Sequence, residues 1–176
     1  MDYSLEYVLG LICGGLIGVV ILLFFRKWTR RDHSNHCKYD ERQQLVRGCG
    51  YKWGFFTFVM CDALYGIVCC LAEIKYVETQ LAMFFIVLFG VAVYVGYCIW
   101  HEGYFALNED RRRVMIAFAL IAIFNFAIFG MDVMHGEAVK NGVLQGSCMN
   151  LGCGLLFVFI FLVILAKMIQ SRGEKE

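Results

Sequence analysis

Residues 79–100 read TQLAMFFIVLFGVAVYVGYCIW, and this stretch, which contains no charged side chain, decides the fold. A helix needs about 20 apolar residues to cross a hydrocarbon core of about 30 Å, so the stretch has the length and composition of a membrane span. It ends at Trp100, a residue type that prefers the membrane–water interface. We therefore predict a transmembrane helix over residues 79–100.

Four further segments share this length and composition. They are residues 7–25, 54–72, 114–131 and 141–166. The chain as a whole agrees, since 60% of its residues are hydrophobic and it has no proline, whereas soluble domains are about half apolar. The sequence predicts an all-α integral membrane protein in which residues 1–176 form a single bundle of five transmembrane helices.

Basic residues predict how these helices are oriented. Of the 16 lysines and arginines, 14 fall in the loop 26–53, the loop 101–113 and the tail that begins at Lys167. The other two are Lys75 and Lys140. Because loops rich in lysine and arginine stay in the cytoplasm, we expect the amino terminus outside, the carboxyl terminus inside, and the protein in the cell membrane.

Cysteine and histidine are the residue types that would indicate disulfides or a metal site. Most of the nine cysteines lie within apolar runs, and Cys37 and Cys49 lie in the basic loop, which we assign to the reducing cytoplasm. We therefore expect no disulfide framework. His33, His36 and Cys37 form only one tight cluster, whereas zinc sites usually pair two. No metal or other cofactor is predicted.

The second half of the loop 26–53 has the pattern of a helix. Asp40 can cap its start, and Gln43 stands three residues later, as in a capping box. Apolar residues then recur at helical spacing on one face; they are Leu45, Val46, Cys49 and Trp53. We expect an amphipathic helix over 40–53 that lies at the membrane interface and runs into the second span.

The loop motif Asp40-Glu41-Arg42-Gln43, with Arg47 and the following Tyr51-Lys52-Trp53, also carries a resemblance. It resembles the D-E-R-Q segment that precedes a membrane span in small multi-pass membrane proteins of bacteria, especially Firmicutes. The segment 104–112, YFALNEDRR, resembles the second cytoplasmic loop of these proteins. The resemblance implies a bacterial cytoplasmic membrane as the home of the protein and brings no activity with it.

Two parts of the chain echo each other at an offset of 70 residues. Asp40 and Arg42 match Asp110 and Arg112, and Asp62 and Gly66 match Asp132 and Gly136. Spans two and three would then be one hairpin, and spans four and five a second hairpin of the same orientation, as in transporters built from parallel repeats. Chance similarity between two apolar hairpins is the alternative.

Asp62 is the most unusual residue of the predicted spans. It lies nine residues past Trp53, about 13 Å into the membrane at 1.5 Å per residue, and an intramembrane carboxylate is by default a candidate functional group. Asn125 and Asn150 are predicted at middle to outer depth and could bond to it. The alternatives are a proton or cation site at Asp62 and a protonated side chain that joins helices.

Small residues recur at every fourth position in two predicted spans. They are Gly10, Gly14 and Gly18 in the first span, and Gly142, Gly146 and Gly154, with Asn150, in the fifth. Such faces allow close approach of helices. They would serve packing within the chain or, alternatively, contact with a partner helix or a second copy.

The chain shows no motif of a catalytic or nucleotide-binding site. Phosphate loops, dinucleotide fingerprints and nucleophile elbows are absent from the sequence. A net charge of +1 gives no basis for nucleic-acid binding. We expect a non-enzymatic membrane protein, in contact with the lipid bilayer, that acts as an accessory or regulatory subunit through helix packing and its basic loop. A small transporter or channel using Asp62 is the alternative, and an intramembrane enzyme is a third option.

Overall fold

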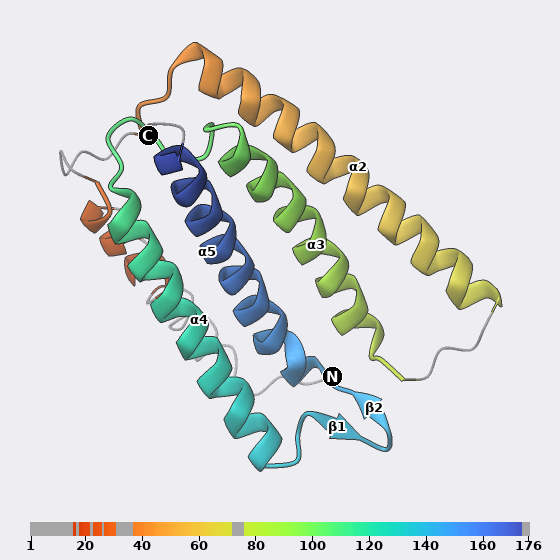
Figure 1. Cartoon of the computed structure of the whole chain (residues 1–176). Coiled ribbons are helices and arrows are strands. Elements are labelled where there is room, and N and C mark those ends of the chain that lie inside the picture. Colours follow the sequence, from red (N-terminus) through yellow and green to blue (C-terminus); the bar gives the residue numbers. More distant parts are fainter. Residues whose placement is uncertain are drawn as a thin grey trace.

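The computed structural model of the chain describes residues 16, 18–21, 23–25, 27–30, 37–71 and 76–173. Four helices in this part are long and apolar enough to cross a membrane. They are α2 (Glu41–Leu71), α3 (Thr79–Trp100), α4 (Arg111–Met134) and α5 (Met149–Gly173), the last preceded by a short 3-10 helix, η1 (Gly146–Cys148) (Figure 1). A mostly helical chain with several such helices is what the sequence predicts of a membrane protein.

The first predicted span, residues 7–25, lies largely outside the described residues. Residues 16, 18–21 and 23–25 are helical. The count of five transmembrane helices and their orientation across the membrane therefore stay predictions.

The four described helices lie in a row. Helix α2 packs on α3, α3 packs on α5, and α5 packs on α4, so that α3 and α5 are central and α2 and α4 are at the edges (Figure 1). The chain alternates in direction from one helix to the next. We call the end where α2 and α4 begin the basic end, and the opposite end, which carries the strands β1 (Val139–Lys140) and β2 (Val143–Leu144), the hairpin end.

The predicted helix over 40–53 forms and runs into the second span, and its position at the membrane interface stays a prediction. Helix α2 is continuous from Glu41 to Leu71, through the boundary that the sequence suggested at residue 54. Gly48 and Gly50 do not interrupt it, and Gly50 and Gly54 are its two buried residues. Gly50 and Gly54 are on the side of α2 that packs on α3, where a small residue permits close contact.

The fifth span starts later than predicted. Residues 139–144 form a hairpin in which Val139 pairs with Leu144 and Lys140 with Val143. Its two turn residues, Asn141 and Gly142, have φ of 53° and 77°, as a type I′ turn requires and as an Asn-Gly pair favours. Helix α5 therefore begins at Met149, eight residues beyond the predicted start of the span at 141.

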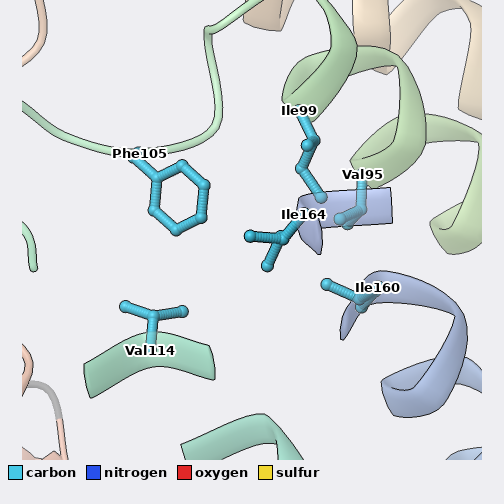
Figure 2. Close-up of a cluster of buried hydrophobic side chains, with 6 residues drawn as sticks. All are labelled: Val95, Ile99, Phe105, Val114, Ile160 and Ile164. Carbon is cyan, nitrogen blue, oxygen red and sulfur yellow. The ribbon is translucent and has the colours of Figure 1, made fainter. Parts of the chain in front are cut away.

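The largest core cluster lies toward the basic end and joins three helices to a loop. Figure 2 shows Phe105 of the loop 101–110 facing side chains of α3, α4 and α5. Its buried members are Val95, Ile99, Phe105, Val114, Ile160 and Ile164. A smaller cluster of Leu81, Ala138 and Cys148 closes the hairpin end. Burial thus fixes α3, α4 and α5 together, and α2 is outside both clusters.

Candidate functional site

At the basic end, the loop before α2 and the loop 101–110 are joined by hydrogen bonds. The Leu107 amide donates to the Lys38 carbonyl at 2.8 Å, and the Lys38 amide donates to Asn108 Oδ1 at 3.2 Å. The Asp110 amide donates to the Thr29 carbonyl at 2.9 Å. The segments around residues 29, 38 and 108 therefore form one hydrogen-bonded cap over the helix ends.

The loop motif Asp40-Glu41-Arg42-Gln43 explains much of this cap. The Gln43 amide donates to Asp40 Oδ1 at 2.6 Å and the Asp40 amide donates to Gln43 Oε1 at 3.3 Å, which is the predicted capping box. Gln43 Nε2 also donates to the carbonyls of Glu102 and Phe105, at 3.2 and 3.0 Å. Asp40 and Gln43 are thus structural, whereas Glu41 and Arg42 are exposed.

Arg47 belongs to an aromatic cluster just inside the cap. Its guanidinium carbon lies 4.1 Å from the centroid of the Tyr39 ring, and its side chain hydrogen-bonds to Tyr51 and Tyr94. The rings of Tyr51 and Tyr94 are stacked, with centroids 4.3 Å apart. Cation–π contact and these bonds fix the direction of the guanidinium.

A cavity of about 300 Å³, which we call the polar cavity, opens beside this cluster. It is lined by Thr29, Tyr39, Arg47, Tyr94, Tyr104, Glu109, Val114 and Phe118. Burial and the neighbouring Glu109 carboxylate raise the pKa of Tyr39 to about 12. The same two causes raise the pKa of Tyr104, so both hydroxyls stay protonated and available as donors at neutral pH.

The polar cavity offers recognition chemistry. It holds a guanidinium, several tyrosine hydroxyls and one carboxylate, whose Oε2 accepts from the Ala106 amide at 3.0 Å. A second, wider cavity of about 660 Å³ lies outside the cap, between Gln43, Met168 and the arginines at the start of α4.

Asp62 is not brought together with the asparagines that could have bonded to it. It lies on α2, at one edge of the row of helices, and Asn125 lies on α4 at the other edge (Figure 1). Asn125 Nδ2 donates to the Ile121 carbonyl of its own helix at 2.8 Å, and Asn150 is the second residue of α5. Within the described part of the chain, no hydrogen bond or ion pair reaches the Asp62 carboxylate.

The contact between α2 and α3 shows at which level along α3 Asp62 lies. A Cβ on Gly54 would meet the Gly90 carbonyl oxygen at 2.9 Å, so the two glycines touch. Gly90 is near the middle of α3, and Asp62 follows Gly54 by eight residues, or about 12 Å toward the hairpin end. Relative to α3, Asp62 is therefore nearer the hairpin end than the middle, which differs from the depth counted from Trp53.

Lys52 is a candidate that the sequence did not single out. It precedes Gly54 by two residues, so it lies on the opposite side of α2 from α3 and at nearly the same depth as Gly90. It is exposed, and among the described residues no carboxylate pairs with it. The sequence assigned it to the loop 26–53 because it lies among basic residues. Its depth follows only from the contact between Gly54 and Gly90.

The predicted glycine faces differ from the glycines that pack. Gly10 and Gly14 lie outside the described residues, and a Cβ on Gly18 would meet no described residue within 4 Å. Gly142 is in the hairpin turn, because the Asn-Gly pair makes that turn, and Gly146 is in η1. Gly154 of α5 does pack on a neighbouring helix, since a Cβ there would meet the Phe126 ring of α4 at 3.0 Å.

Apart from Gly154, the sequence did not single out the glycines at which helices approach each other most closely. They are Gly50 and Gly54 of α2, Gly90 of α3 and Gly152 of α5, the last against Phe85. The spacing of Gly50 and Gly54 by four residues was a usable signal, but we had assigned Gly50 to an interfacial helix.

No metal centre is formed by the residues that the structure describes, where no group of three or more histidine, cysteine, aspartate or glutamate side chains comes together. The candidate site is therefore the cap with the polar cavity, together with the outer side of α2. Comparison of the chain with protein families, with curated proteins and with solved structures finds no match.

Proposed function

We propose that the protein is a non-enzymatic, multi-pass membrane protein that acts as an accessory or regulatory subunit of a larger membrane assembly. Helix α2 would bind the partner, and the cap at the basic end would hold α2 in place. The basic end would face the cytoplasm of a bacterial cell, in line with the distribution of lysine and arginine and with the D-E-R-Q resemblance.

One observation carries this proposal: Lys52, which no carboxylate of the described residues pairs with, lies on the outer side of α2, level with the middle of α3. A lysine at the centre of a membrane helix costs about 2.5–3.5 kcal/mol on insertion scales. The neighbouring outward residues Trp53, Phe56 and Met60 are large, apolar and more than half exposed. A partner helix with a carboxylate would neutralise the ammonium and cover these side chains.

The alternative, a transporter or channel that uses Asp62, has less support. Such a protein needs Asp62 beside a second polar group or a cavity, as in proton relays. The two cavities described above are lined by other residues. The asparagines that could have paired with Asp62 lie on α4 and α5.

Photocrosslinking in the native membrane tests the proposal. A photoreactive amino acid replaces Phe56 of α2, 51% exposed, or Phe124 of α4, 65% exposed, as the matched control. We expect a discrete adduct from position 56 that is weak or absent from position 124. Lys52→Leu should reduce it at least about fivefold, since about 1 kcal/mol of coupling is at stake.

Two other outcomes are informative. An adduct of twice the mass of the chain would identify a second copy as the occupant of this face. Crosslinking at position 56 to lipid alone, unchanged by Lys52→Leu, would contradict the proposal.

A further inference from the structure

A third cavity adjoins the polar cavity, and its lining is apolar. It is an apolar groove of about 370 Å³ between α2 and α3. Its lining residues are Tyr51, Gly54, Phe55, Phe58, Val87, Gly90, Val91 and Tyr94. Gly54 and Gly90, which line the groove, are where the backbones of α2 and α3 touch, and Val87 and Val91 lie open to the outside, at 46% and 37% exposure.

The two cavities share a wall and follow one another along α2. Tyr94 lines both. Its partner in stacking, Tyr51, lines the groove, and both hydrogen-bond to Arg47 of the polar cavity. From Arg47 to Phe58 the distance along α2 is 11 residues, about 16 Å. A polar chamber at the helix ends is thus followed by an apolar groove that runs toward the middle of the bundle.

The charges of the polar cavity are of both signs. Arg47 and Glu109 both line it, and no ion pair joins them in the described part of the chain. Guanidinium groups suit phosphate, to which they can donate two hydrogen bonds. A carboxylate and the faces of tyrosine rings suit an ammonium group. The cavity therefore complements a head group that carries a phosphate and an amine.

We propose that the polar cavity and the groove together bind one zwitterionic phospholipid of the phosphatidylethanolamine type. Arg47 receives the phosphate, Glu109 and the tyrosines receive the ammonium group, and one acyl chain follows the groove past Gly54 and Gly90. This lipid site lies on the side of α2 that faces α3, so it is separate from the outer side of α2 and from the partner proposed there.

Lipid retention by the purified full-length protein tests this site. Native mass spectrometry in mild detergent would count the lipids retained from equal amounts of phosphatidylethanolamine and phosphatidylglycerol. We expect the parent to retain phosphatidylethanolamine preferentially. Arg47→Gln should lower that retention at least about tenfold, since a hydrogen bond to a charged group is lost, whereas Arg42→Gln, an exposed arginine of the same helix, should behave like the parent.

Two further variants separate the head group from the chain. Glu109→Gln should lower the retention of phosphatidylethanolamine to that of phosphatidylglycerol, because only the ammonium group loses its partner. Val91→Trp fills the groove from an exposed position and should lower retention of both lipids. Val59→Trp is its control, since Val59 is similarly exposed, at 41%, and does not line the groove.

Several results would overturn the proposal. Equal retention of the two lipids by the parent would exclude a zwitterion site. If soluble phosphoethanolamine is retained as strongly as the lipid, and Val91→Trp has no effect, the cavity would be assigned to a soluble compound. If Arg47→Gln does not fold, Glu109→Gln and Val91→Trp decide, and parent-like retention in both would refute the lipid site.

Discussion

The hairpin of α2 and α3 and the hairpin of α4 and α5 are built alike and differ in their outer helix. Helices α2 and α4 begin at Glu41 and Arg111, each directly after an aspartate, and α3 and α5 begin at Thr79 and Met149. Helix α4 has no charge between Arg113 and Asp132, whereas α2 carries Arg47, Lys52 and Asp62. The two outer helices therefore differ in the charge that they carry between their ends.

The starts of both helix pairs are 70 residues apart, which is the offset of the sequence echo. The order of the row, with α3 and α5 central, is the one that a two-fold rotation about an axis between them would give (Figure 1). Lys38 and Asn108, which bond to each other, are also 70 residues apart, as residues near such an axis would be. These coincidences favour a parallel repeat over chance similarity.

The largest expected effect comes from separating α2 from α3. Gly90→Leu places a Cβ 3.0 Å from the Gly54 carbonyl oxygen, so it should lower the free energy of unfolding by about 2–3 kcal/mol. Gly130→Leu of α4 is the matched control, since a Cβ there meets nothing within 4 Å. Thermal unfolding in detergent measures both. Equal melting of the two variants would mean that the α2 hairpin does not depend on glycine contact.

A smaller effect is expected where the first loop joins the second. Gln43→Ala removes half of the capping box and both side-chain bonds to the loop 101–110, and should cost about 1–2 kcal/mol. Gln43→Glu keeps the acceptor for the Asp40 amide and loses the two donors, so it should fall between Ala and the parent. Gln44→Ala, at an exposed position, is the control. If Gln43→Ala is as stable as the parent in chemical denaturation, the hydrogen bonds of the cap do not contribute to stability.

The smallest effect is expected at Asp62. Since its carboxylate has no partner among the described residues, Asp62→Asn and Asp62→Leu should change the free energy of unfolding by less than about 0.5 kcal/mol. Asp110→Leu provides the contrast: its carboxylate accepts from the Arg112 amide at 3.0 Å, and losing this cap should cost about 1 kcal/mol. Destabilisation by both Asp62 variants beyond the Asp110 variant would reveal a partner within the chain.

Hydropathy predicted the segments well because a span is a local property. Residues 79–100 match α3 at both ends, and Asp40 and Gln43 form the capping box that their spacing indicated. The fifth span was misplaced because Val139, Val143 and Leu144 are apolar enough to extend it, although Asn141-Gly142 is a hairpin signal. There, turn chemistry overrides composition.

The candidate site was harder to predict, because it depends on how one helix is shifted along another. The depth of Lys52 and Asp62 is set by the contact between Gly54 and Gly90, and this shape match has no signature in hydropathy. The polar cavity likewise combines Thr29, Arg47, Tyr94 and Glu109 from four separate segments. Single residues such as Arg47 could be named from the sequence, but not their neighbours.

The unequal lengths of α2 and α3 give the molecule a dependence on bilayer thickness. Helix α2 has 31 residues, about 46 Å, and α3 has 22 residues, about 33 Å. A hydrocarbon layer of about 30 Å matches α3, while α2 has to tilt steeply or extend into water. A change in bilayer thickness therefore first alters how much of α2 extends into water. The depth of Lys52 in the bilayer changes with it.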